Sequence, residues 1–302
     1  MARRIIIDTD PGIDDALAIF VALRSSELDI AGVTTVAGNI GIHTTTRNAG
    51  RILTFCGRSD IPVFAGAARP LSDRRLDSAD IHGGDGLGGV ALPEPEAAAG
   101  DDAIGWMAAL LEAEPARSID VLALGPLTNL ARLTLDHPSA AARIGRVIAM
   151  GGAIHERGNV GPRAEFNIAA DPDAADIVFR SGVSLTLIPL DATRKVRATR
   201  ETLSILRATG RPMATVSAAL IEAYFDSTAD QSQAVESRPL HDPCVMVQAA
   251  DPSIFGLERL AISVDMQTGA LDVDDQDGAG IDVALTVDGA SCLAFIAGRL
   301  SS

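Results

Sequence analysis

Residues 5–16 read IIIDTDPGIDDA, an apolar run that leads directly into four aspartates. Three consecutive isoleucines are typical of a buried strand, and the Pro-Gly pair that follows predicts a tight turn. The apolar spacing of Leu17, Phe20 and Val21 then predicts a helix. The aspartates therefore fall at the carboxyl end of a strand, which is where ligands bind in an open α/β sheet.

The four carboxylates of this stretch are a candidate metal site. They belong to Asp8, Asp10, Asp14 and Asp15, and unpaired carboxylates so close together raise one another's pKa. A hard cation removes this penalty. Calcium accepts a flexible set of oxygen ligands, whereas magnesium demands an octahedron and keeps its waters, so we expect Ca²⁺. The simpler alternative is that Asp14 or Asp15 caps the helix, but a cap needs one acid and four are present.

The fold class follows from the alternation of strand and helix patterns along the chain. This alternation predicts an α/β protein with an open, mainly parallel, Rossmann-like sheet flanked by helices and a site at the strand carboxyl ends. No linker or charge block divides the chain, so we expect a single domain over residues 1–302. Further strands are expected at 28–36, 63–66, 120–125, 147–152, 183–190, 260–264 and 281–287, and helices at 44–56, 102–112, 201–207, 213–225 and 290–300, with others opening at 126, 171 and 241.

The composition argues against several classes of partner. Hydrophobic residues make up 47% of the chain and aromatic residues only 3%, which indicates an aliphatic core. The net charge of −15 argues against contact with nucleic acid or anionic lipid, because both require clustered lysine and arginine. The apolar runs are too short to cross a membrane, and Asp8 ends the first one before a signal peptide could form. We therefore expect a cytoplasmic protein in which Cys56, Cys244 and Cys292 are reduced thiols.

Two polar residues are candidates because of their positions. Asn39 follows the strand expected at 28–36, so it lies near the aspartates if the two strands are neighbours, although alone it is better explained as closing a turn. His82 lies in residues 81–89, which contain five glycines. Long glycine-rich loops are often functional, and His82 is equally well explained as a site residue or as a local hydrogen-bonding residue.

The later polar segments offer acceptors for hydroxyl groups. A loop expected at 153–170 contains Asn159, Glu165 and Asn167, which suit the binding of hydroxyl groups better than phosphate, although they could simply face solvent. Asp242, just before Pro243, is able to cap a helix or to serve the site. The acidic residues 272–280 lack the spacing of an EF-hand, so we expect a solvated turn there.

The opening stretch, taken with His241-Asp242-Pro243, resembles the inosine-uridine preferring nucleoside hydrolases. The match continues in chain order through Asn39, the His82 loop, 125–129, Met150-Gly151-Gly152 and 159–167, and so covers nearly the whole chain. The resemblance implies the nucleoside hydrolase fold and hydrolysis of the N-glycosidic bond of ribonucleosides to free base and ribose, through a Ca²⁺-bound water. It also implies a homo-oligomer, either a dimer or a tetramer.

The same resemblance implies roles for individual residues. Calcium would be held by Asp10, Asp15, Asp242 and the main-chain carbonyl of Leu124, with the 2′- and 3′-hydroxyls of ribose and one water completing its shell. Asp10 would accept the proton of the attacking water, and His241 would donate one to the leaving base, because an imidazole ordinarily titrates near working pH. The residues expected to bind the substrate are Asp14, Asn39, His82, Met150, Asn159, Glu165, Phe166 and Asn167, with Met150 and Phe166 as pocket walls.

The expected chemistry also follows from the residue types, without the family resemblance. Cleavage of an N-glycosidic bond builds positive charge on the ribose ring, so a carboxylate-lined pocket stabilises the transition state more than the neutral substrate. His241 is typical of family members with broad or inosine-uridine preference, whereas purine-specific members sandwich the base between tryptophans. The single Trp106 lies outside the matching segments, which disfavours a purine-only pocket. A polar flap expected at 226–238, with Gln231 and Gln233, leaves the preferred base open.

Two other functions compete with this one. A haloacid dehalogenase-type phosphatase also has aspartates after a strand, but it needs Thr or Val where Gly12 stands, and Lys195 is the only lysine available for its chemistry. A non-catalytic nucleoside- or sugar-binding protein on the same scaffold would keep the hydroxyl-binding residues and the calcium. The presence of His241 and of the full set of acids argues against this second alternative.

Overall fold

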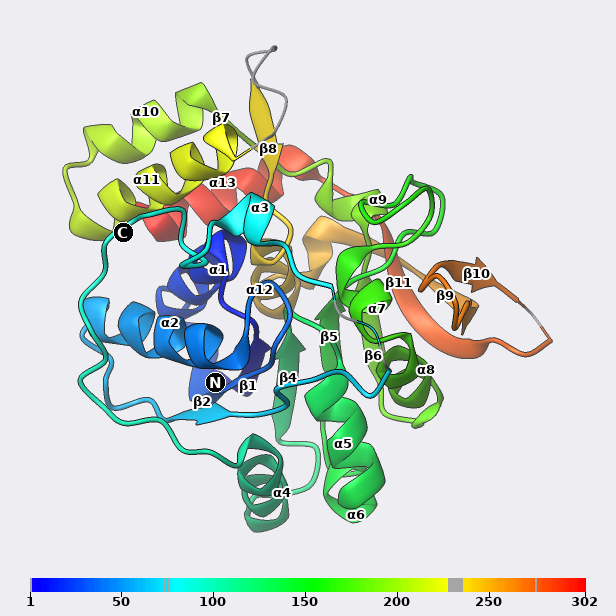
Figure 1. Cartoon of the computed structure of the whole chain (residues 1–302). Helices are drawn as coiled ribbons and strands as arrows, with labels where there is room; N and C mark the ends of the chain where they lie inside the picture. Colours follow the sequence, from blue (N-terminus) through cyan, green and yellow to red (C-terminus); the bar gives the residue numbers. More distant parts are fainter. Residues whose placement is uncertain (1, 73, 75, 228–235, 275) are drawn as a thin grey trace.

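The computed structural model describes residues 2–72, 74, 76–227, 236–274 and 276–302, and its centre is a nine-stranded sheet (Figure 1). The strand order is β10-β9-β11-β6-β5-β4-β1-β2-β3. The strands from β11 to β3 pair in parallel, and β9 and β10 pair antiparallel at one edge. This arrangement confirms the predicted open, mainly parallel α/β sheet. Strand bounds are β1 Arg3–Thr9, β2 Leu28–Thr35, β3 Val63–Ala65, β4 Ile119–Ala123, β5 Val147–Met150, β6 Leu185–Ile188, β9 Phe255–Val264, β10 Leu271–Val273 and β11 Ala279–Val287.

Strand β1 is at the centre because its isoleucines serve both faces of the sheet. Ile5 and Ile7 belong to one hydrophobic core and Ile6 to the other, and all three are fully buried. A parallel sheet that is covered on both faces needs such a continuous apolar run. Figure 1 shows the two groups of helices that provide this cover. One face carries α1 Ile13–Leu23, α2 Ile42–Phe55, α10 Arg200–Ala208, α11 Pro212–Asp226, α12 Pro243–Ala250 and α13 Gly289–Leu300, and the other α4 Ala103–Ala113, α5 Thr128–Asp136, α6 Pro138–Ala141 and α8 Pro172–Arg180.

Several short elements were not predicted from the sequence. The helix α7, Phe166–Ala170, lies inside the loop expected at 153–170, and α3, Ala79–His82, ends at the glycine-rich segment. A further helix, α9, spans Leu190–Thr193, and the turn Pro252–Ile254 is a 3-10 helix. Strand β10 occupies the start of the expected acidic turn, because residues 271–273 pair with β9.

The expected flap at 226–238 is only partly described. Its residues 228–235, including Gln231 and Gln233, lie outside the described residues. Asp226 ends helix α11, and Ser237–Pro239 forms β8, which pairs antiparallel with β7, Arg197–Thr199. The described ends of this segment are therefore regular rather than unpatterned.

The sheet brings the expected site residues to one edge. Strand β1 lies between β2 and β4, and Thr9 pairs with Thr35 while Asp8 pairs with Ala123. Strand β5 follows β4 in the sheet. The carboxyl ends of four neighbouring strands thus lie side by side. No helix of the described residues is long and apolar enough to cross a membrane.

Candidate active site

A cavity of about 350 Å³ opens beyond the carboxyl ends of these strands. It is lined by every predicted site residue except Asp8, Asp10 and Asp15, which are almost completely buried. Asp8, which the sequence placed in the candidate metal site, instead binds the side chains of Thr34 and Asn129. Prediction from the sequence missed six lining residues. These are Asp77, Ser78, Asp80, Ile81, Val160 and Tyr224.

The sequence contains little that would have identified these six residues as part of the cavity lining. Residues 77–81 lie in the long segment without periodicity, and Tyr224 occupies an ordinary buried position in helix α11. Ser78 has a structural role at the site, because its hydroxyl donates a hydrogen bond of 2.6 Å to Asn39 Oδ1. Ser78 therefore helps to orient an amide that the sequence did predict.

Asp10 and Asp15 are held by donors at the β1–α1 turn. Asp15 Oδ2 accepts hydrogen bonds from the Gly12 amide at 2.9 Å and from Asn39 Nδ2 at 3.1 Å. Asp15 therefore also caps helix α1, as the simpler alternative proposed. Asp10 Oδ2 accepts the Asn39 amide at 2.7 Å, whereas its Oδ1 is buried without a hydrogen-bond partner among the described residues.

Glycines make room for the Asp10 carboxylate. A Cβ atom at Gly38 would lie 2.1 Å from Asp10 Oδ2, and one at Gly125 would lie 2.4 Å from Asp10 Oδ1. These two glycines follow β2 and β4, the strands on either side of β1, so the segments after both strands leave space for the same carboxyl group. At Gly12 a Cβ would lie 2.6 Å from His82 Nδ1, which explains the glycine of the opening turn.

Asp14 connects the start of helix α1 with residues 241–242, which lie far along the chain. Its Oδ2 accepts the backbone amides of His241 at 2.7 Å and Asp242 at 3.1 Å, and its Oδ1 is buried without a partner among the described residues. Asp242 precedes helix α12, with Pro243 at the first helical position, but its side chain makes no capping hydrogen bond. The alternative in which Asp242 is only a cap is therefore wrong.

Burial and mutual repulsion both act on these acids. Burial raises the pKa of Asp14 to about 7, and it raises the pKa values of Asp10 and Asp242 well above their usual range. The charge of Asp15 contributes to the rise of all three pKa values. A divalent cation would relieve this repulsion.

The donor atoms at this site are of the kind that bind a cation, but they are not arranged as a complete coordination site. Within the described part of the chain, no three His, Cys, Asp or Glu side chains form a group that could hold a metal ion. The Leu124 carbonyl, an expected ligand, accepts a 2.7 Å hydrogen bond from Asn167 Nδ2, which leaves it one lone pair. The two partnerless oxygens, Asp10 Oδ1 and Asp14 Oδ1, fit a missing electropositive partner.

The loop after β5 places the polar groups expected to bind hydroxyls. Glu165 caps helix α7, with its Oε2 accepting the amides of Gly152 at 2.9 Å and Asn167 at 3.0 Å. Burial raises the pKa of Glu165 to about 7. Asn159 Oδ1 accepts the Phe166 amide at 2.9 Å, and Asn167 Nδ2 also donates to the Met150 carbonyl at 3.1 Å. Hydrogen bonds within this loop and to the segments that end β4 and β5 thus hold these side chains in place.

Two histidines line the cavity, and both are held neutral. His82 Nδ1 accepts the Ile13 amide at 3.1 Å, and burial lowers the His82 pKa to about 4. His241 Nδ1 lies 2.7 Å from Thr193 Oγ1. Burial, together with the charges of Arg194 and Arg197, lowers the His241 pKa to about 3. The expectation that the His241 imidazole titrates near neutral pH is therefore wrong.

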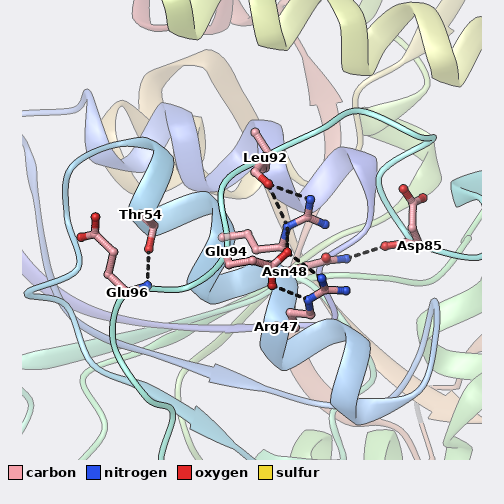
Figure 2. Close-up of polar contacts among 8 residues, drawn as sticks. Arg47, Asn48, Thr54, Asp85, Leu92, Glu94 and Glu96 are labelled. Atoms are coloured by element: carbon pink, nitrogen blue, oxygen red, sulfur yellow. Dashed lines mark hydrogen bonds and ion pairs between the residues drawn. The ribbon is translucent and has the colours of Figure 1, made fainter.

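Helix α2 fixes the segment that follows His82. Figure 2 shows its side chains reaching across to residues 85–96. Asn48 Nδ2 donates to the Asp85 carbonyl at 2.8 Å and to the Pro11 carbonyl at 3.2 Å. Arg47 pairs with Glu94 at 2.6 Å. Asn48 thus ties the His82 segment to the acidic turn.

The comparisons with known proteins identify the family of this chain. The family model described as "Inosine-uridine preferring nucleoside hydrolase" matches residues 5–294. The pyrimidine-specific ribonucleoside hydrolase RihA of Salmonella newport is 41% identical over 268 residues, which cover 88% of this chain and 86% of that protein. RihA of Photobacterium profundum is also 41% identical, with the same coverage.

Solved structures agree as well. The plant nucleoside hydrolase PpNRh1 superposes with a TM-score of 0.93 at 34% identity and covers 100% of both chains. A purine-preferring ribonucleoside hydrolase from Gardnerella vaginalis gives a TM-score of 0.92 at 30% identity and covers 99% of this chain and 98% of that chain. These matches set aside the dehalogenase-type phosphatase and the non-catalytic binding protein. The chain belongs to the inosine-uridine preferring nucleoside hydrolases and is an N-ribohydrolase.

Proposed function

We propose that this enzyme hydrolyses the N-glycosidic bond of ribonucleosides, with pyrimidine ribonucleosides preferred, and that it does so with Ca²⁺ bound by its buried aspartates. One observation carries the proposal. Aspartates from the two ends of the chain, Asp10, Asp14, Asp15 and Asp242, gather at the base of a cavity whose other walls carry Asn and Glu side chains.

The residues that would hold the ion are Asp10, Asp15, Asp242 and the Leu124 carbonyl. Oxygen ligands of this kind suit calcium, and the buried, partnerless Asp10 Oδ1 supports the assignment. When bound, Ca²⁺ would supply a Lewis acid that lowers the pKa of a water and holds vicinal hydroxyls.

The protein's own side chains would transfer protons, stabilise the transition state and bind the substrate. Asp10 would accept a proton from the attacking water as the general base. Asp14 and Glu165 place negative charge around the ribose, which stabilises the positive charge that develops on the ring. Asn39, Asn159 and Asn167 bind the hydroxyls, while Met150 and Phe166 form walls and His82 lies beside the base.

His241, held neutral, would stabilise the departing base by donating a hydrogen bond from its ring N–H to the nitrogen on which negative charge develops. We expect His241→Ala to lower kcat for uridine by about 10²-fold, the usual cost of removing one such donor, and to change kcat for 4-nitrophenyl riboside by less than about 3-fold. The nitrophenolate is already stable as an anion, so only the nucleoside needs the donor. Steady-state assays of both substrates check this, and equal losses on the two would remove His241 from the role.

Base preference is tested by a nucleoside panel. The relatives at 41% identity are named pyrimidine-specific, whereas a purine-preferring enzyme is 30% identical. Trp106 stacks on Phe64 with ring centroids 4.7 Å apart and is not among the residues that line the cavity. We expect kcat/KM for uridine and cytidine to exceed that for inosine by about 10-fold or more, measured by release of free base and ribose. A preference for inosine would overturn this assignment, and no release of base from any nucleoside would overturn the activity.

A further inference from the structure

The short helix α9 and the residue after it hold the segment of chain that leads to Asn159. The carboxylate of Asp191, in α9, is almost completely buried and accepts three consecutive backbone amides, those of residues 154–156, at 2.8 to 3.2 Å. Charged acceptors of this kind make the stronger hydrogen bonds. The first half of the segment is therefore fixed by an acid of α9.

Arg194, which directly follows α9, binds the residues that come next. Its Nη1 donates to the Arg157 carbonyl at 2.5 Å, and its Nη2 donates to the Gly158 carbonyl at 3.0 Å. The planar guanidinium suits two acceptors that lie side by side in this way. Arg194 also pairs with the Glu156 carboxylate at 3.2 Å, but the Glu156 side chain is 47% exposed, and exposed ion pairs stabilise little. The two carbonyl contacts are therefore the ones that hold the segment.

The segment ends at Asn159, which lines the cavity although it is itself exposed. Its Oδ1 accepts the Phe166 amide at 2.9 Å, and its backbone amide donates to the Ala164 carbonyl at 3.0 Å. Its Nδ2 has no acceptor among the described residues, so this group is available to a hydroxyl in the cavity. An exposed side chain has little packing to fix it, so the place of Asn159 depends on the backbone before it.

We propose that Arg194 is a positioning residue for the hydrolysis. By holding the carbonyls of Arg157 and Gly158, it fixes Asn159 at the wall of the cavity, where Asn159 Nδ2 donates to a hydroxyl of ribose. Loss of Arg194 weakens the binding of substrate and transition state alike, so KM rises and kcat changes little. This inference rests on the proposed role of Asn159 in binding the substrate.

Kinetics with a matched control give the first test. We expect Arg194→Met, which keeps the length of the side chain, to raise KM for uridine by about 5-fold to 10-fold and to change kcat by less than about 3-fold. Arg143→Met is the control, because Arg143 also donates to two carbonyls, those of Leu111 at 2.7 Å and Glu114 at 2.6 Å, but does not line the cavity. Its KM should stay within about 2-fold of the unmodified enzyme. Equal rises of KM in the two variants would overturn the inference.

Coupling to Asn159 separates positioning from a general loss of stability. In the Asn159→Ala enzyme, the added Arg194→Met should raise KM by less than about 2-fold, because the side chain that Arg194 positions is gone. The full effect of Arg194→Met in both backgrounds would overturn the inference. An unchanged KM in Asn159→Ala alone would also overturn it, because Arg194 would then position nothing that binds the substrate.

Hydrogen exchange of the substrate-free enzyme tests the contact without any catalysis. The amides of residues 158–160 donate to the carbonyls of Pro162 and Ala164, and we expect them to exchange about 10-fold faster in Arg194→Met. The amides of residues 154–156 are an internal control, since Asp191 still binds them. Unchanged exchange at 158–160 would overturn the inference. If the unmodified enzyme hydrolyses no nucleoside, the proposed function fails, while the exchange rates still decide whether Arg194 holds this segment.

Discussion

Substitution of Asp10 by Asn is expected to lower kcat for uridine hydrolysis by about 10⁴-fold, the upper range for loss of a general base. The amide removes both the proton acceptor and one negative charge from the proposed calcium site. It also places an NH₂ group in the narrow space that Gly38 and Gly125 leave for the carboxylate, beside the Asn39 amide that donates to it. The measurement is steady-state release of uracil at saturating uridine and calcium.

Asp8→Asn is the matched control for this substitution. Asp8 is a buried aspartate two residues earlier, and its Oδ1 alone accepts the Thr34 hydroxyl at 2.6 Å and Asn129 Nδ2 at 2.7 Å. An asparagine keeps that oxygen and both hydrogen bonds, so we expect kcat within about 10-fold of the unmodified enzyme. Comparable losses in the two variants would mean that any charge change on β1 disables the enzyme, and Asp10 would have no special role.

Removal of calcium is expected to lower activity by about 10³-fold or more, and added Ca²⁺ should restore it more fully than Mg²⁺. The reason is the cluster of acids, since Asp10, Asp15 and Asp242 are buried within reach of one another's charge. The measurement is uridine hydrolysis after treatment with EGTA and gel filtration, with the remaining metal determined by elemental analysis. Full activity at a metal content far below one ion per chain would contradict the proposed cofactor.

The sequence alone could place three aspartates together because the signals that position them are local. A run of isoleucines, a Pro-Gly turn and clustered aspartates place Asp10, Asp14 and Asp15 at a strand end within a dozen residues. Asn39 follows from the same logic, because β2 is the parallel neighbour of β1. The approach of Asp242 to Asp14 could be inferred only from the family resemblance, since 227 residues separate His241 from Asp14 in the hydrogen bond that joins them.

The short elements around the cavity could not be predicted, because their stability comes from tertiary contacts. Helix α7 has five residues and is capped by the Glu165 carboxylate, which also binds the Gly152 amide. Helix α9 has four residues, and its Asp191 holds a distant loop. Helices this short are not stable alone, so periodicity gives no signal for them. Arg194, directly after α9, was missed for that reason.

The protonation state of His241 shows a different limit. An unperturbed imidazole titrates close to neutral pH, which made His241 a plausible charged acid from the sequence. Burial and the nearby Arg194 and Arg197 lower its pKa to about 3, and none of these effects can be inferred from the residues next to it in the chain.

A crystal structure of the enzyme grown with Ca²⁺ and ribose tests the central claim most directly. We expect one calcium ion at about 2.3 to 2.6 Å from carboxylate oxygens of Asp10, Asp15 and Asp242, with the 2′- and 3′-hydroxyls of ribose in the same coordination shell. Ribose bound in the cavity without a metal ion, or calcium bound by other residues, would contradict the claim.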